Sequence, residues 1–131
     1  MRKPANVMQH QTNALRELLV AMQIELPAGY VVFVTDTGRG RCNYRHKTIT
    51  VPQWAANNTK RGTQWHKGDK RYVEYYLAHE CAHAFTFEET GERNHRGAFM
   101  QNFMKLCPPD LWHFETNYKP GLARAAGIKA Q

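Results

Sequence analysis

Residues 77–85 read LAHECAHAF and contain two histidines, His79 and His83, with Glu80 directly after the first. On an α-helix, residues four apart lie one turn apart on the same face, so both imidazoles can reach one metal ion. Glu80 would then lie beside the ion, where its carboxylate can take a proton from water and pass it to a leaving amine. This spacing predicts a helix that carries a zinc site suited to hydrolysing an amide bond.

A catalytic zinc ion needs a third protein ligand and keeps a fourth position open. His95 is the strongest candidate, because it follows His83 by twelve residues, past a turn that contains Gly91, at the start of the next helix. His113 is a weaker candidate, as a donor that supports a ligand or the transition state. Three carboxylates compete for the third position: Glu88, Glu89 and Glu92. We therefore expect one Zn²⁺ ion held by His79 and His83, with His95 preferred over the carboxylates as the third ligand.

The helix that carries the motif is expected from about residue 70 to 87, with Asp69 as its N-cap. Upstream, residues 12–25 place an apolar stripe at helical spacing, with Thr12 or Asn13 as the cap. Residues 30–35 are β-branched and aromatic and predict a buried strand, and residues 41–51 predict two further strands joined near residues 45–47. We expect these three strands to form a small antiparallel sheet.

Two segments are expected to lie outside the core. Residues 53–69 are polar and contain two glycines, which predicts a long surface loop. The sequence pattern fits a lid and a plain connecting loop equally well. After a helix over residues 97–107, which Pro108 and Pro109 end, residues 108–131 are expected to form a tail. This tail should hold a short helical turn around residues 111–114 before it frays.

The chain totals are typical of one globular domain. It has 131 residues, of which 42% are hydrophobic and 22% charged. No apolar run is long enough to cross a bilayer, and the first residues show no signal-peptide core. The three cysteines have no paired spacing, so no disulfide framework is implied. We expect a cytoplasmic monomer that does not bind membranes.

The net charge of +7 is concentrated in one segment. Between Arg39 and Arg71 there are nine Lys or Arg residues and one acid, Asp69, with aromatic residues interleaved. Cationic groups beside aromatic rings suit a phosphate backbone with stackable bases, although a solvated basic surface is the simpler interpretation. The candidate nucleic-acid contacts are Arg39, Arg41, Arg45, Lys47, Lys60, Arg61 and Trp65.

Three sequence features together resemble the SprT-like metallopeptidases, a family that includes a protease of DNA–protein crosslinks. These are HECAHAFTF, the later NHRGAF that enters a helix, and the upstream GRGRCNYRHKTITVPQW. His95 and Phe99 keep the family's four-residue separation, but glycine is at position 97 rather than directly after the histidine. The similarity spans residues 12–107, and no zinc ribbon follows it, as in minimal forms from bacterial or phage genomes.

The resemblance implies an α+β, minimal zincin-like metalloprotease domain over residues 1–131. In it a small sheet packs on an N-terminal helix, an HExxH helix and a third-ligand helix. It also implies that His79, His83 and His95 bind zinc and that Glu80 is the general base and acid. The expected activity is that of a zinc endopeptidase acting on proteins held on single-stranded or duplex DNA, with an Arg or Tyr side chain steadying the oxyanion. The alternative is a nucleic-acid-binding module with a structural or vestigial zinc site.

Overall fold

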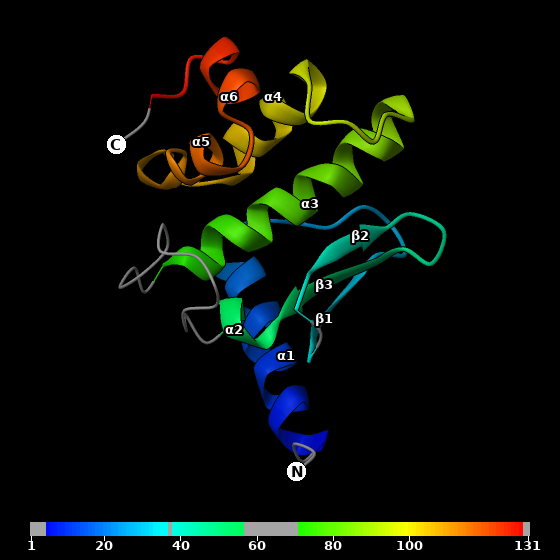
Figure 1. Cartoon of the computed structure of the whole chain (residues 1–131). Coiled ribbons are helices and arrows are strands. Elements are labelled where there is room, and N and C mark those ends of the chain that lie inside the picture. The colour runs from blue at the N-terminus through cyan, green and yellow to red at the C-terminus, as the bar shows by residue number, and fades with distance from the viewer. Residues whose placement is uncertain (1–4, 37, 57–70, 130–131) are drawn as a thin grey trace.

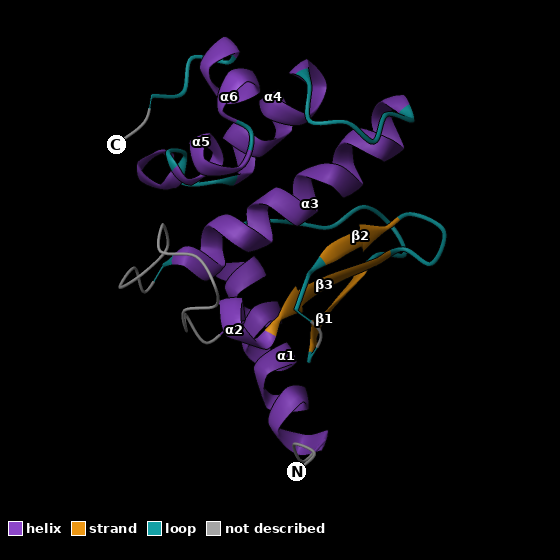
Figure 2. Cartoon of the chain, viewed as in Figure 1, coloured by secondary structure: helices purple, strands orange, loops and turns teal. Residues whose placement is uncertain are grey.

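The computed structural model describes residues 5–36, 38–56 and 71–129 (Figure 1). The elements are α1 (Ala5–Ala21), β1 (Val31–Thr35), β2 (Arg41–Asn43), β3 (Thr48–Pro52), α2 (Gln53–Ala56), α3 (Tyr72–Thr90), α4 (Gly97–Leu106), the 3₁₀ turn η1 (Pro109–Leu111), α5 (Phe114–Tyr118) and α6 (Pro120–Ala125). Helices and one small sheet make up the fold, which confirms the α+β class (Figure 2). Among the described helices, none has the length and apolar character needed to span a bilayer.

Helix α3 is the central element of the molecule. It passes between the sheet on one side and helices α4, α5 and α6 on the other (Figure 1), and it contacts β2, β3 and α4. Because both sides of α3 are covered, every residue from Leu77 to Ala84 is buried. Small side chains at Ala78, Ala82 and Ala84 let the neighbouring layers approach the helix closely. The histidine motif therefore lies in the middle of the protein.

The sheet is mixed, so the expected all-antiparallel arrangement is wrong. Its strand order is β1-β3-β2, in which β3 pairs antiparallel with β2 and parallel with β1. The alternation of apolar residues predicted β2 and β3 correctly, with Ile49 and Val51 fully buried in β3. The expectation that β1 is a buried strand holds for one face only, because Val31 and Phe33 on its other face are 42% and 40% exposed. However, alternation reports only which face of a strand is covered and does not identify the neighbouring strand. The most buried strand, β3, takes the central position between the other two.

Helix α1 starts earlier and ends earlier than its pattern predicted. The apolar stripe was predicted correctly, since Leu15 and Leu19 are buried, but the helix runs over Ala5–Ala21. Thr12 is inside it and is not its cap. The Thr12 hydroxyl instead accepts a hydrogen bond from the backbone N–H of Val34, at 2.9 Å, and so ties α1 to β1.

The ends of α3 differ in part from the prediction. Arg71 occupies the N-cap position without a side-chain capping hydrogen bond, and the predicted cap, Asp69, lies outside the described residues. At the other end α3 continues to Thr90, and Gly91 closes it in the left-handed conformation with φ 74°. Of the predicted 53–69 loop, residues 53–56 form α2 and the others lie outside the described part of the chain.

The segment after Pro108 is folded, and the expectation that it frays is wrong. It forms η1, α5 and α6, and it buries Leu111, Phe114, Ala123 and Ile128. Phe114 packs edge-on against Tyr72, with 5.1 Å between ring centroids, and in a tilted arrangement against Tyr75, with 5.5 Å between centroids. These contacts join α5 to α3, and α6 packs in turn on α4 and α5. The described residues 108–129 therefore contribute to the same core as the segments before them.

Candidate metal centre

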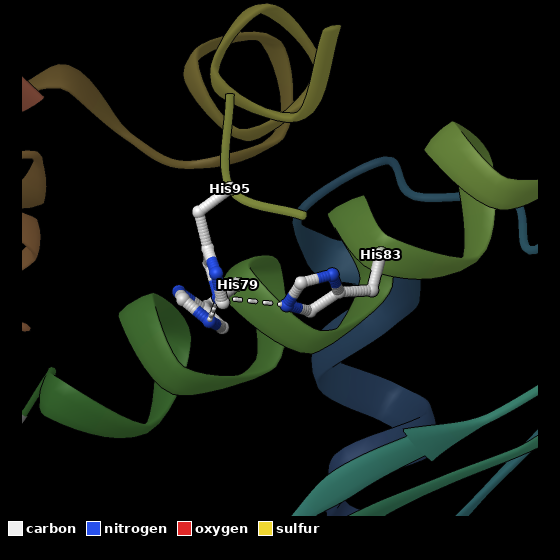
Figure 3. A group of neighbouring side chains, drawn as sticks. All are labelled: His79, His83 and His95. Carbon is white, nitrogen blue, oxygen red and sulfur yellow. Dashed lines mark hydrogen bonds between the residues drawn. The ribbon is translucent and has the colours of Figure 1, made fainter. Parts of the chain in front are cut away.

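Three histidines from two parts of the chain converge on one point, as Figure 3 shows. His79 and His83 lie one turn apart on α3, and His95 comes from the connector that leads into α4. The Nε2 atom of His95 is 3.1 Å from Nε2 of His83 and 3.3 Å from Nε2 of His79. One ligand atom from each residue lies within 4.8 Å of the others. The three side chains are therefore close enough to bind a single metal ion.

The distances between these nitrogens fit a tetrahedral ion. With Zn–N bonds of 2.0–2.1 Å, neighbouring ligand atoms in a tetrahedral site lie about 3.3 Å apart, close to the two separations observed. Two imidazole lone pairs this close together repel one another unless a proton or a cation lies between them. The donor set, three imidazoles with no thiolate, is one that catalytic zinc sites use.

Phe99 holds the three rings in place. It is fully buried on α4, four residues after His95. Its ring centroid lies 4.5 Å from that of His83, 4.8 Å from His95 and 5.0 Å from His79. Because one aromatic side chain contacts all three imidazoles, the packing of α4 on α3 sets the geometry of the site.

A buried carboxylate from the C-terminal segment orients the first histidine. The Nδ1 atom of His79 donates to Oε1 of Glu115 at 2.8 Å, and the hydroxyl of Tyr75 donates to the same oxygen at 2.8 Å. Glu115 is fully buried, and its other oxygen, Oε2, has no hydrogen-bond partner in the described part of the chain. A buried anion that is only half satisfied fits a site that receives a cation.

The protonation of the three imidazoles follows from burial and charge. Burial, reinforced by the neighbouring His79 and His95, lowers the pKa of His83 to about 3. Burial and His79 lower the pKa of His95 to about 4. For His79, burial acts in the same direction, but the hydrogen bond and the charge of Glu115 outweigh it and raise its pKa. His83 and His95 are therefore neutral near pH 7, the form in which imidazole binds a metal.

Glu80 lines the cleft that opens beside the histidines. The cleft has a volume of about 470 Å³, and its walls include His79, His83 and His95. Glu80 is buried, with only 8% of the residue exposed. Burial raises the pKa of Glu80 to about 7, with a smaller opposite effect from His79. A carboxyl group whose pKa is close to neutral pH can both accept and release a proton.

Tyr118 forms another part of the cleft wall. Its ring centroid is 5.2 Å from that of His79 and 5.3 Å from that of His95, both edge-to-face. Burial, then the carboxylates of Glu80 and Glu115, raise the pKa of its phenol, while Arg39 acts in the opposite direction. The phenol therefore keeps its proton near neutral pH and can donate a hydrogen bond into the cleft.

The competing ligand candidates lie elsewhere. Glu88 accepts a hydrogen bond from the Tyr30 hydroxyl, and Glu89 accepts one from the Asn102 amide. Glu92 is exposed. His113 is the N-cap residue directly before α5. It packs on Phe114, with 4.3 Å between ring centroids, and does not line the cleft.

The predicted basic residues divide into two groups. Arg39 and Arg41 line the cleft, together with Trp54 and Tyr76. Arg45 and Lys47 lie in the turn between β2 and β3, with the Lys47 ammonium 5.8 Å from the centroid of the Tyr30 ring. The other three candidates, Lys60, Arg61 and Trp65, lie outside the described residues.

Sequence reasoning missed Glu115 and Tyr118. A signal was present: Leu111, Phe114 and Tyr118 recur at helical spacing, and Glu115 lies on the same stripe. A carboxylate on an apolar stripe predicts a buried partner for it. Its contact with His79, however, joins residues 36 apart in the chain, and no local pattern identifies that partner.

The chain was compared with protein-family models, with curated proteins and with solved structures, and none of them matches it.

Proposed function

We propose that this protein is a zinc-dependent endopeptidase of the SprT-like kind. The observation that carries the proposal is the convergence of three imidazole Nε2 atoms beside Glu80 at the wall of an open cleft. A structural zinc site is closed by four protein ligands, whereas a catalytic one keeps a position for water or substrate. Three histidines and no fourth ligand in the described cluster favour the catalytic kind.

Each residue has a separate role in the proposed reaction. His79, His83 and His95 would hold the ion, and zinc when bound would polarise the scissile carbonyl and lower the pKa of a water molecule. Glu80 accepts the proton of the attacking water and then delivers it to the leaving amine, so that the amide bond breaks without releasing an amide anion. Burial raises the pKa of Glu80 above its usual value, which makes it a stronger proton acceptor.

Tyr118 is the proposed donor to the oxyanion. Negative charge develops on the carbonyl oxygen during attack, and a phenol already placed at the wall can stabilise it without reorganising. The edge-to-face contacts of Tyr118 with His79 and His95 hold its ring next to the place where the carbonyl would lie. Arg39 and Arg41 line the same cleft and add positive potential there.

The test separates metal binding from chemistry. Glu80→Gln should keep one zinc per chain but cut unfolded casein about 10²–10⁴-fold more slowly than the wild type, because general acid–base catalysis is lost. His83→Ala should lose both zinc and cleavage. Zinc content by mass spectrometry or atomic absorption, and cleavage by gel, are the two readouts. If the wild type holds zinc and cleaves nothing, with or without single-stranded DNA, the endopeptidase proposal is wrong.

We further propose that the basic residues bring the protease to proteins on DNA. Arg39 and Arg41 at the cleft and Arg45 and Lys47 in the β2–β3 turn could contact one phosphate backbone, and such binding weakens steeply with salt. The measurement is affinity for single-stranded and duplex oligonucleotides at several salt concentrations. Charge reversal at Arg41 and Arg45 should flatten the salt dependence. Unchanged affinity would mean that these residues only solubilise the protein.

A further inference from the structure

The guanidinium of Arg93 packs on a pair of stacked aromatic rings at the wall of the cleft. Tyr44, from the turn after β2, and Phe87, from α3, stack with their centroids 4.4 Å apart. The guanidinium carbon of Arg93 is 5.1 Å from the centroid of Tyr44 and 5.2 Å from that of Phe87. Cation–π contacts of this kind hold the planar guanidinium in one orientation while leaving its N–H donors available.

The positive charge of Arg93 is not balanced inside the cleft. Among the described residues the ion pairs involve Arg71 and His79, and none involves Arg93. Of the described residues that line the cleft, Glu80 is the only acid, whereas Arg39, Arg41 and Arg93 are cationic. The cleft is therefore electropositive before any metal ion binds, and a negative group on its occupant would be stabilised there.

Arg93 is close to the reaction centre. It precedes His95 by two residues and lines the same cleft as His83 and Glu80. A cleft of about 470 Å³ holds only a few residues of an extended chain. An anion that reaches Arg93 must therefore belong to the segment of substrate that lies across the histidines.

We propose that Arg93 is a specificity-determining residue that binds a side-chain carboxylate of the polypeptide substrate. The endopeptidase would then prefer Asp or Glu at a fixed position near the scissile bond. The guanidinium fork matches a carboxylate with two parallel N–H···O hydrogen bonds. This inference rests on the proposed endopeptidase function and names the substrate class of that site.

A nucleic acid is the less favoured occupant of this subsite. Single-stranded nucleic acids are held by base stacking on free aromatic faces as well as by charge. The rings of Tyr44 and Phe87 already stack on one another and are covered by Arg93. The subsite therefore offers a guanidinium group but no free aromatic face on which a base could stack.

The test is a cleavage-site profile of the zinc-loaded full chain on a mixture of unfolded proteins, read by mass spectrometry. The wild type should show Asp and Glu enriched at one position relative to the cut. A matched peptide pair with Glu or Gln at that position should differ by about tenfold or more in kcat/KM, the range of a lost charged hydrogen bond. Arg93→Gln should abolish that difference and retain zinc, and Arg93→Glu should shift the preference to Lys or Arg.

The control is Arg96→Gln, which removes an exposed arginine three residues along the chain that does not line the cleft. It should keep the wild-type profile. Cleavage without acidic preference, or an unchanged profile in Arg93→Gln, overturns this inference and leaves the endopeptidase function standing. A zinc-loaded wild type that cleaves nothing overturns both. If Arg93→Gln weakens binding to a single-stranded oligonucleotide but leaves the profile unchanged, Arg93 belongs to a nucleic-acid surface and the proposal is wrong.

Discussion

At the scale of single residues, Glu115 orients one of the three histidines that converge. An ionised carboxylate can only accept hydrogen bonds, so the Glu115 contact places the proton of His79 on Nδ1. The lone pair of Nε2 is then free to face the point shared with His83 and His95. The Tyr75 hydroxyl holds the carboxylate in turn. Two buried hydrogen bonds thus determine the orientation of one imidazole.

We predict that Glu115→Gln weakens zinc binding about 10–100-fold, the range seen when an outer carboxylate partner of a ligating histidine is removed. The amide keeps the shape of the side chain but lacks the charge that makes the imidazole basic. Competition with a chromophoric chelator measures the affinity. Glu89→Gln is the matched control, because Glu89 also pairs with one buried side chain, Asn102, but lies away from the cleft. Equal affinities for the two variants would contradict this role for Glu115.

At the scale of elements, the approach of β2 to α3 depends on Gly40. Its backbone N–H donates to the Tyr76 hydroxyl of α3 at 2.8 Å. A Cβ atom at position 40 would lie 2.2 Å from the backbone oxygen of Thr50 in β3 and 2.8 Å from a ring carbon of Tyr76. Glycine therefore lets the strand and the helix meet at the rim of the cleft.

We predict that Gly40→Ala lowers the free energy of unfolding by at least about 1–3 kcal/mol, since the clash involves backbone that cannot rotate away. Urea denaturation followed by circular dichroism measures the change. Gly121→Ala, in α6, is the control, because no atom lies within 4 Å of its added Cβ. That variant should differ from the wild type by less than about 0.5 kcal/mol. Similar losses of unfolding free energy in both variants would show that the close approach at Gly40 is not the cause of the destabilisation.

At the scale of the whole molecule, the C-terminal helices complete both the core and the site. Phe114 is 2% exposed and contacts Tyr72 and Tyr75 from the side of α3 opposite the sheet. The next residue is Glu115. The packing of α5 on α3 and the positioning of His79 therefore depend on one another. A substitution that loosens α5 should also change the orientation of His79.

We predict that Phe114→Ala destabilises the protein by about 3–5 kcal/mol, the usual cost of deleting a buried phenylalanine ring. Phe33→Ala is the matched control, since Phe33 is 40% exposed on β1 and should cost far less. Thermal unfolding of both variants gives the comparison. A small effect at Phe114 would mean that α5 packs only weakly on the core.

We also predict that zinc stabilises the folded protein, because the site exists only when α3, the connector and α5 are assembled. Free zinc at 100 times the dissociation constant should add about 2.7 kcal/mol. Unfolding curves with increasing zinc measure this gain. His95→Ala, which leaves only the two histidines of α3, should reduce the gain at the same zinc concentration. A gain of equal size in His95→Ala would exclude His95 as a ligand.

The sequence alone determined those parts of the site that depend on local geometry. The four-residue spacing places His79 and His83 on one side of α3, and the short connector confines His95 to the start of α4. A β-branched run predicted β1, and apolar alternation predicted β2, β3 and the burial of Ile49 and Val51. These inferences succeed because helix and strand periods relate residues a few positions apart.

Only the tertiary structure decided which distant residues meet. Three contacts join segments that helix or strand periodicity does not relate. They are the parallel pairing of β1 with β3, the hydrogen bond between His79 and Glu115, and the packing of Arg93 on Tyr44 and Phe87. Such contacts depend on how apolar faces of several elements are buried together, and many packings satisfy the same local pattern. The sequence therefore predicted which three histidines converge, while the packing of α5 and the β2–β3 turn on α3 decided what surrounds them.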